Sequence, residues 1–230
     1  MRIFVFEFIT GGGWFLADPV SPPTGGLLRE GRAMAEAIVE DFTAIDGVET
    51  VRLVDARLGV QQSSGSESIS IQSADELTEQ FTVAAASADF TLVIAPEIDD
   101  HLRNFAKAVL NAGGALLGPS PEFIRLASNK HRTAQSLANA RILTPIGRLH
   151  SPGKTLPSDF PFPAALKPID GAGSLNIQRI ENVAQISAVG LSSSMRLEQY
   201  HPGVPVSVAA IRGRSGFTLL PPCLQSISDT

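Results

Sequence analysis

The fold of this chain is decided by the stretch Phe162-Pro163-Ala164-Ala165-Leu166-Lys167-Pro168-Ile169-Asp170-Gly171-Ala172-Gly173-Ser174. A proline turn leads into a short apolar strand that ends at Lys167, and a loop of small residues follows. Residues 177–180 have the pattern of a return strand. Two strands joined by such a loop form a flap rich in backbone N–H groups, which converge on phosphate because glycine allows close approach. Lys167 would add a point charge to a phosphate, whereas the competing interpretation is an ordinary hairpin with a surface lysine.

Two neighbouring stretches favour the phosphate-binding interpretation. Upstream, Ser128-Asn129-Lys130 opens a helix, and either Ser128 or Asn129 can cap it. A lysine in the first turn opposes the helix dipole, which is mildly unfavourable unless the positive potential serves a binding role. Downstream, the segment Arg196-Leu197-Glu198-Gln199-Tyr200-His201-Pro202-Gly203 is predicted to be a strand that runs into a turn.

Taken in order, the helix lysine, the motif K-P-x-x-G-x-G-S and the motif E-x-Y-x-x-G resemble the ATP-grasp superfamily. The resemblance implies that two lysines hold the phosphates of ATP, that the Gly-rich loop closes over them, and that the last strand is a hinge against which adenine lies. The ATP-binding residues carried over by position are Lys130, Lys167, Gly171, Gly173, Ser174, Glu198, Gln199, Tyr200 and His201.

Four further segments are similar to one branch of that superfamily, which includes tyramine–glutamate ligase of methanofuran synthesis and relatives in one-carbon metabolism. They are M-R-I-F-V-F-E-F-I-T-G-G-G at the start, E-G-R-A-M at 30–34, A-P-E at 95–97 and S-N-K at 128–130. The resemblance implies an ATP-dependent carboxylate–amine ligase that acts on a small-molecule carboxylate and amine. ATP converts the carboxylate to an acyl phosphate, and the amine displaces phosphate to form an amide.

The composition is that of a soluble protein with a sizeable core. The chain has 230 residues, 43% of them hydrophobic and 18% charged, and 18 basic against 23 acidic residues give a net charge of -5. No basic stripe is present, so a nucleic-acid surface is not expected. No stretch is long enough to span a membrane, and the single cysteine favours a reducing, cytoplasmic location. The four histidines lack metal-ligand spacing, and no metal ligand is assigned.

Strand and helix patterns alternate over the first 120 residues, which predicts a small doubly wound α/β unit. Strands are expected at 3–9, 51–54, 90–94 and 115–118, and helices at 27–42, 74–86 and 99–112. The helix at 27–42 is predicted to face inward with Leu27, Met34, Ile38 and Phe42, and that at 99–112 with Leu102, Phe105, Ala106, Val109 and Leu110. The Ser-, Gln- and Gly-rich segment 61–73 is expected to be an exposed loop.

Ligands bind at the carboxyl edge of such a sheet, and five residues are predicted to lie there as substrate contacts. They are Glu7, Gly11, Gly12, Gly13 and Glu97. The two carboxylates suit an amine, although a structural salt bridge explains either equally well. Three glycines after one strand and Asp55 after the next also suggest an NAD-binding dehydrogenase domain. That alternative is disfavoured because G-G-G is not G-x-G-x-x-G and a Pro-rich loop precedes the helix.

The remainder, residues 121–230, is predicted to be an incomplete α+β ATP-grasp domain that follows the pre-ATP-grasp-like domain of residues 1–120. Strands are expected at 146–149, in the apolar run that ends at 167, and at 177–180, 196–200, 206–211 and 217–220, with helices at 121–125, from 130 onward and at 183–189.

Two departures from the family pattern limit the prediction. Gly203-Val204-Pro205 lacks the acid that often follows the hinge glycine, and Asp229 is the only acid after Glu198. The family holds Mg²⁺ with an acid and a Glu-x-Asn near its C-terminus, so those ligands are expected outside this segment. The chain is then a fragment of a ligase or a truncated, regulatory or inactive nucleotide-binding homologue. Its last strands are expected to need a partner or an oligomer to cover them.

Overall fold

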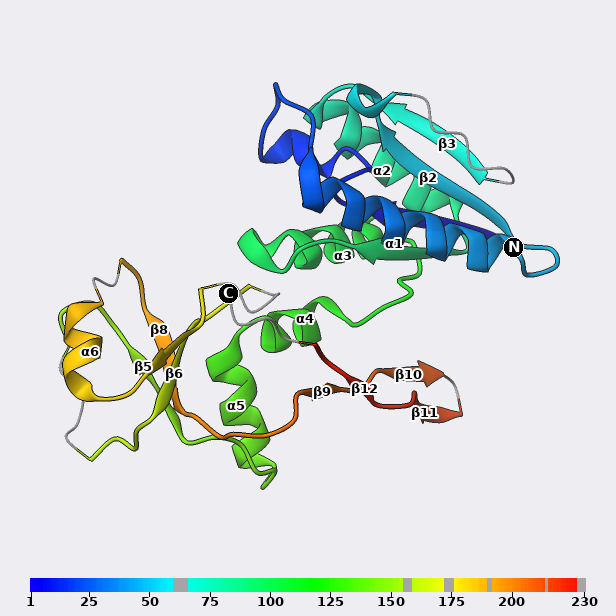
Figure 1. The fold of residues 1–230 in the computed structure, drawn as a ribbon. Helices are drawn as coiled ribbons and strands as arrows, with labels where there is room; N and C mark the ends of the chain where they lie inside the picture. Colours follow the sequence, from blue (N-terminus) through cyan, green and yellow to red (C-terminus); the bar gives the residue numbers. More distant parts are fainter. Residues whose placement is uncertain (60–65, 155–158, 172–175, 190–191, 214, 227–230) are drawn as a thin grey trace.

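The structure is a computed structural model that describes residues 1–59, 66–154, 159–171, 176–189, 192–213 and 215–226 (Figure 1). Two four-stranded sheets organise the chain, one parallel and one antiparallel, and an extended ribbon follows the second. The predicted fold class is confirmed: an N-terminal parallel α/β sheet is followed by a mixed α+β part. None of the described helices is long and apolar enough to cross a membrane.

The first sheet has the order β3-β2-β1-β4, and every neighbouring pair is parallel. Helix α1 covers one face, while α2 and α3 cover the other (Figure 1). The elements are β1 (Arg2–Glu7), α1 (Gly25–Thr43), β2 (Glu49–Asp55), β3 (Ser66–Ile71), α2 (Ala74–Ser87), β4 (Phe90–Ile94) and α3 (His101–Asn111), with short 3₁₀ turns at Gly13–Leu16, Ala56–Leu58 and Ile98–Asp100. Because both faces are covered, β1 is a nearly continuous apolar run, as its sequence predicted.

Aromatic rings fill the face of this sheet that α2 and α3 cover. Phe6 of β1 lies edge-on to Phe81 of α2, with ring centroids 5.0 Å apart, and 4.5 Å from the ring of Phe105 of α3. On the opposite face, Ile3 and Val5 pack against Val39 of α1. The alternation of β1 residues between the two faces therefore serves two separate apolar clusters.

One prediction about this half was wrong, and another was right only in part. Residues 66–71 form the edge strand β3 and not a loop; residues 61–65 of that prediction lie outside the described residues. Ile69 and Ile71 lie two apart on one side of the strand, and Ile71 is fully buried. On α1, the predicted inward residues Ile38 and Phe42 do pack against the cluster of Ile3, Val5 and Val39, whereas Leu27 and Met34 are exposed. The fully inward positions of this helix are Gly31, Ala35 and Val39.

Three smaller differences separate the structure from the predicted elements. Leu110 of α3 is exposed although its helical spacing predicted an inward position. The strand predicted at 115–118 is a single parallel bridge between Leu116 and Thr91. The strand predicted at 206–211 is divided into two short strands.

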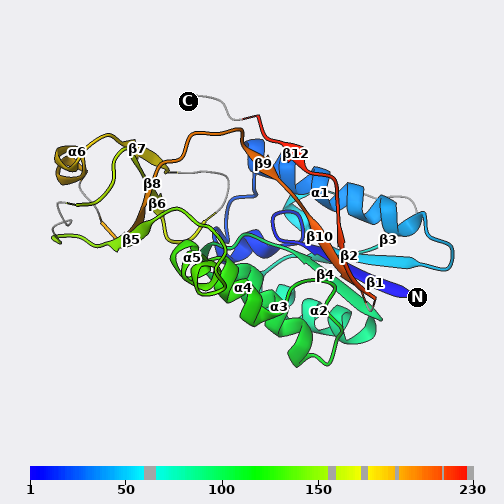
Figure 2. The same ribbon diagram turned by 90° about the horizontal axis from the view of Figure 1, so that it is seen from below.

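The second sheet has the order β5-β8-β6-β7 and is antiparallel throughout. Its elements are α4 (Pro121–Ala127), α5 (Lys130–Asn139), β5 (Gly147–His150), β6 (Ala164–Pro168), β7 (Gln178–Ile180), α6 (Val183–Ala188) and β8 (Met195–Gln199). Helices α3, α4 and α5 follow one another side by side and connect the two sheets (Figure 2). An apolar cluster of Phe160, Ala164, Leu166, Ile180, Ile186 and Leu197 occupies one side of the second sheet.

The ribbon after β8 consists of two successive antiparallel pairs, β9 with β12 and β10 with β11 (Figure 1). The strands are β9 (Val206–Ser207), β10 (Ala210–Gly213), β11 (Gly216–Leu219) and β12 (Cys223–Leu224), and all their described side chains are exposed. The expectation that a partner or an oligomer covers these strands stays a prediction.

Candidate functional site

The predicted strand lysine lies on the face of the second sheet opposite its apolar cluster. Lys167 of β6 is aligned with Arg196 of β8, and Ala165 is aligned with Glu198. Lys167 and Glu198 are therefore diagonal neighbours, and Lys167 Nζ forms an ion pair with Glu198 Oε1. Arg196 and Glu198 share a face because they are two residues apart on one strand.

Arg196 holds the other oxygen of this carboxylate. Its Nε donates to Glu198 Oε2 over 2.8 Å, so Glu198 is bound by two cations. Burial by itself raises the pKa of Glu198, but the hydrogen bonds from Lys167 and Arg196 outweigh it and place the pKa below the usual value. Glu198 is therefore ionised at neutral pH, and it keeps the Lys167 ammonium at the end of β6.

The predicted helix lysine lies beside the same loop. Asn129 caps α5, with its Oδ1 accepting from Arg132 N over 2.9 Å, and this places Lys130 in the first turn as predicted. The Lys130 Nζ donates to Asp170 O (3.0 Å) and to Gly171 O (2.6 Å). Burial lowers the pKa of Lys130, and the charges of Glu97 and Asp170 act in the opposite direction. Both predicted lysines thus flank the loop that follows β6.

Only the start of the predicted Gly-rich loop is described. Gly171 has φ +89°, a left-handed conformation that suits glycine, and it lies close to Ile98 of the first half of the chain. Gly173 and Ser174 lie outside the described residues. The prediction that these two residues bind phosphate therefore stays a prediction.

The predicted hinge already uses two of its backbone donors within the protein. Gln199 N donates to Ile146 O over 2.7 Å, and Tyr200 N donates to Pro163 O over 2.9 Å. The guanidinium of Arg179 lies over the Tyr200 ring, 4.6 Å from its centroid. His201 is exposed, and its role as an adenine contact stays a prediction, as do those of Glu198, Gln199 and Tyr200.

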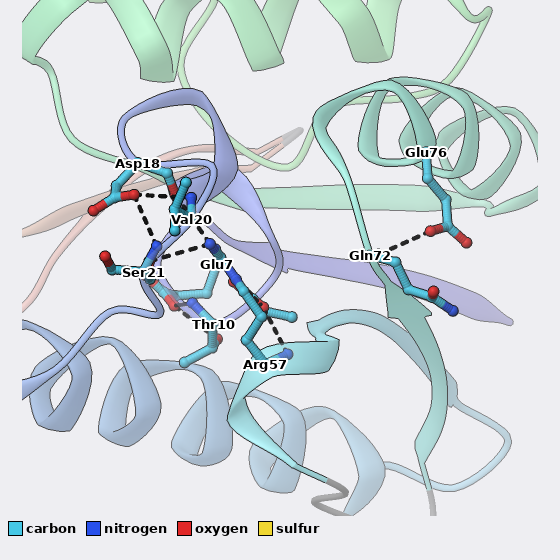
Figure 3. A network of polar contacts seen from close by, with 9 residues as sticks. Glu7, Thr10, Asp18, Val20, Ser21, Arg57, Gln72 and Glu76 are labelled. Atoms are coloured by element: carbon cyan, nitrogen blue, oxygen red, sulfur yellow. Dashed lines mark hydrogen bonds and ion pairs between the residues drawn. The ribbon is translucent and has the colours of Figure 1, made fainter.

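The five predicted substrate contacts do not form one group of free side chains. Glu7 is 4% exposed, and its carboxylate accepts from Ile9 N at 3.0 Å and from both the N and the Oγ1 of Thr10 at 2.7 Å (Figure 3). A Cβ at Gly31 of α1 would lie 2.8 Å from Glu7 Oε2, so this glycine lets the helix approach the carboxylate. Glu97 follows β4 and is half-buried, and its charge acts on Lys130.

The three glycines form a tightly packed turn. Gly11, Gly12 and Gly13 are all buried, and Gly11 N donates to Glu7 O over 2.8 Å. A Cβ at Gly13 would lie 2.4 Å from the Phe8 ring, and one at Gly12, where φ is +91°, would lie 2.9 Å from Ile71. Close packing and a left-handed backbone explain these glycines without a ligand.

A polar network at the same sheet edge was not predicted from the sequence. Asp55, at the end of β2, is fully buried, and Arg57 binds both of its oxygens, with Nη2 to Oδ2 at 2.6 Å and Nε to Oδ1 at 2.9 Å. Arg57 Nη1 also donates to the carbonyls of Asp18 and Ser21 (Figure 3). Its guanidinium lies 3.5 Å from the centroid of the Phe15 ring. Asp18 in turn accepts from Val20 N and Ser21 N. Asp55 anchors the Pro-rich loop, which argues against the dinucleotide-binding alternative.

The described residues contain no group of three or more His, Cys, Asp or Glu side chains that could hold a metal ion. The carboxylates that come together are each bound by a cation or by backbone N–H groups. Within the described part of the chain, the residues present therefore do not fit a magnesium ion.

Comparison with known proteins identifies the class to which this fold belongs. A family model described as the pre ATP-grasp 3 domain matches residues 48–124. A crystal structure described as an ATP-grasp superfamily protein of Archaeoglobus fulgidus gives a TM-score of 0.68 at 18% identity, covering 100% of this chain and 62% of that one. D-alanine–D-alanine ligase of Bacillus anthracis complexed with ATP gives 0.57 at 16% identity, covering 90% and 62%. The chain has the ATP-grasp fold, and the predicted resemblance to that superfamily is confirmed.

A curated relative places the resemblance within the superfamily. The chain is 28% identical over 149 residues to the tyramine–L-glutamate ligase of Methanocaldococcus jannaschii. The match covers 64% of this chain and 44% of that ligase, so the chain spans less than half of the relative's length. The chain thus resembles the tyramine–glutamate ligase branch, as its sequence segments predicted.

Proposed function

We propose that this chain forms the ATP-binding part of an ATP-dependent carboxylate–amine ligase. The observation that carries the proposal is the convergence of Lys130 and Lys167 on one loop, from a helix and a strand that are 37 residues apart in the sequence. The similarity to a tyramine–glutamate ligase and to a ligase complexed with ATP supports the same activity.

Contacts within the protein already hold both lysines in place. Lys130 donates to loop carbonyls and Lys167 pairs with Glu198, so neither ammonium has to be ordered from bulk solvent. Each ammonium has three donors, and a phosphate oxygen can therefore be added to or exchanged for these partners. Ordering both cations in advance reduces the entropy lost on binding.

When bound, ATP would supply the phosphoryl group that activates a carboxylate for attack by an amine. Lys130 and Lys167 would neutralise phosphate charge, Gly171, Gly173 and Ser174 would approach it through their backbone, and residues 198–201 would contact adenine. The described residues do not fit Mg²⁺, so they would not hold the ion. The expectation remains that the metal ligands lie outside this segment.

Among the five substrate candidates, Glu97 is the one we retain for an amine. Its side chain is half-buried near Lys130, whereas Glu7 is enclosed and its oxygens already accept three hydrogen bonds. The three glycines are better explained by packing. The substrates we propose are a small-molecule carboxylate and a small-molecule amine in the cytoplasm.

Calorimetric titration with ATP, with and without Mg²⁺, tests the nucleotide site. The wild-type chain should bind ATP, and Lys167→Ala should lose about tenfold or more in affinity, the effect of losing a charged hydrogen bond. Lys130→Ala should show a similar loss. Lys154→Ala removes an exposed lysine on the loop after β5 and is the matched control. Unchanged affinity in both site variants, or no binding by the wild type, contradicts the proposal.

One observation favours a second function, that of a nucleotide-binding regulator without catalysis. The described residues bring together no acidic cluster for a metal ion. A regulator would bind ATP through the same lysines but would release no phosphate from ATP when glutamate and an amine are both supplied. Release of phosphate that depends on both substrates, measured by a coupled phosphate assay, would exclude this alternative.

A further inference from the structure

Arg196 lies between the two elements that carry the predicted phosphate-binding lysines. Its side chain is 3% exposed, and its guanidinium makes three different contacts. Nε donates to Glu198 Oε2 at 2.8 Å, Nη1 contacts His131 Nδ1 at 3.0 Å, and Nη2 donates to Pro145 O at 3.3 Å. Through Glu198, Arg196 is connected to Lys167 on β6. Through His131, it is connected to α5, where His131 directly follows Lys130 in the sequence.

The contact with His131 defines the protonation state of the imidazole. A guanidinium can only donate hydrogen bonds, so the Nδ1 of His131 must accept, and the ring is then neutral with its proton on Nε2. Burial lowers the pKa of His131 most, and the charge of Arg196 lowers it further. Both favour the same neutral form. The geometry and the electrostatics therefore agree on a neutral His131.

The backbone beside Arg196 is shaped to admit its guanidinium. Gly147 of β5 is aligned with Glu198 of β8, and a Cβ at Gly147 would lie 2.5 Å from Arg196 Nη2 and 2.9 Å from Glu198 Cβ. Any larger residue at this position would displace the guanidinium or the strand. The absence of a side chain at Gly147 thus leaves space for the buried Arg196 next to Glu198, the carboxylate that Arg196 orients.

We propose that Arg196 is a positioning residue of the nucleotide site, which aligns Glu198 and Lys167 with Lys130 through its hydrogen bond to neutral His131. The effect on ATP binding rests on the proposed function, since the aligned lysines are those that we propose to bind ATP. A buried arginine fixed at three points can transmit this alignment because its fork is planar and rigid.

The inference predicts that acid conditions weaken the alignment. A protonated His131 would turn an N–H toward Arg196, so the acceptor would be lost and two cations would face each other. The other charged groups of this network are Glu198 on β8, Lys167 on β6 and Lys130 on the same helix. From β5, which also packs on α5, the Arg148 guanidinium lies instead 3.9 Å from Asp159. The carboxylates of Glu97 and Asp170 act on Lys130. Glu198 is the carboxylate that contacts Arg196, and both of its oxygens are already bound.

Two readouts on the full chain test the proposal. The first is the rate at which trace acetic anhydride modifies Lys167, followed by peptide mass spectrometry with exposed Lys154 as the internal reference. The second is ATP affinity by calorimetry at pH 5.5 and pH 7.5. The variants are Arg196→Lys, which keeps the charge but loses the fork, and His131→Asn, whose amide oxygen can accept from Arg196 without titrating. Arg29→Lys, at an exposed position of α1, is the control.

We expect Arg196→Lys to raise the Lys167 modification rate severalfold and to weaken ATP binding about tenfold at pH 7.5, as the loss of one charged hydrogen bond would. His131→Asn should show a smaller loss of affinity between pH 7.5 and pH 5.5 than the wild type, and since the protonation of ATP is common to both proteins, the difference reports on His131. Unchanged modification of Lys167 in Arg196→Lys overturns the inference. If modification rises in that variant but the wild type binds no ATP, the alignment stands and the proposed function fails.

Discussion

Two arginine–carboxylate pairs, one in each half of the chain and each with one buried member, differ in what they leave available. In the first sheet, Arg57 binds both oxygens of Asp55, two loop carbonyls and an aromatic ring, so every part of the guanidinium is engaged within the fold. In the second sheet, Arg196 leaves one oxygen of Glu198 to Lys167, whose side chain is 25% exposed.

Similar groups can stabilise the fold in one place and form part of a candidate site in another. The Asp55 carboxylate is 0% exposed, and its partner Arg57 also donates to carbonyls of the loop at 18–21. The pair therefore fixes the backbone that follows β1 and β2. The Glu198 carboxylate is 12% exposed and its second partner is a lysine with donors to spare. We call the Asp55–Arg57 pair closed, because its partners all lie within the fold. We call the Glu198–Arg196 pair open, because Glu198 also holds Lys167, whose positive charge lies beside the loop after β6.

The largest effect is expected when the closed pair is broken. Among the described residues, Arg57→Ala leaves the buried Asp55 carboxylate with a single partner, the backbone N–H of residue 57. An unpaired buried charge costs about 3–5 kcal/mol in the free energy of unfolding. Urea denaturation followed by circular dichroism measures this. Arg29→Ala, on the exposed face of α1, should change stability by less than about 0.5 kcal/mol. A loss of under 1 kcal/mol in Arg57→Ala would mean that the pair is not closed in solution.

A smaller effect is expected at the other arginine. Arg196→Ala leaves Glu198 with Lys167 as a partner, so the cost should be about 1–3 kcal/mol, the range for losing hydrogen bonds to a charged group. The same urea titration compares the two variants directly. If Arg196→Ala is the more destabilising, the distinction between a closed and an open pair is wrong.

The glycine beside Arg196 gives a third and more local test. Gly147→Ala should cost about 1–2 kcal/mol, because the new methyl group would meet the guanidinium and the Cβ of Glu198. Gly26→Ala is the matched control, since its new methyl would meet only the Arg29 side chain, 3.9 Å away. Thermal melts of the two variants separate the effects. Equal melting temperatures would show that the sheet adjusts to a side chain at position 147.

Much of the fold could be predicted from the sequence because local signals agreed with it. Apolar runs located β1 and β4, and Asn129 before Lys130 predicted the start of α5. The inward face of α1 was predicted only in part: Ile38 and Phe42 do pack inward, but the buried small residues Gly31 and Ala35 were missed, since hydrophobicity does not reveal them. The helix approaches Glu7 at Gly31. The edge strand β3 was missed because serine and glutamate dominate its exposed side.

The site could be predicted only as far as motif order allows. The two lysines were predicted because they occur in family motifs, and the structure brings both to the loop after β6, while their binding of phosphate stays a prediction. Arg57 and Arg196 were missed because their importance depends on contacts made in the folded chain, such as the one between Arg196 and His131, 65 residues apart. No local pattern records such a pairing, although an arginine two residues before a strand glutamate is a usable signal, since both side chains share a face.

The smallest effect concerns the titration of His131 and the stability of the open pair. Because the folded-state pKa of His131 lies below its usual value of 6.5, the folded chain binds this proton less readily than the unfolded chain does. The contribution of the neutral ring is therefore fully present above pH 6.5 and is lost as the pH falls through the folded-state pKa. The loss should be below about 1 kcal/mol because the ring is partly exposed. Melting temperatures from pH 7.5 to 5.0 should fall more steeply for the wild type than for His131→Asn, since the variant removes this titration and keeps an acceptor for Arg196. Parallel curves would show that His131 protonates without disturbing Arg196, and the open pair would then depend on Glu198 and Lys167 alone.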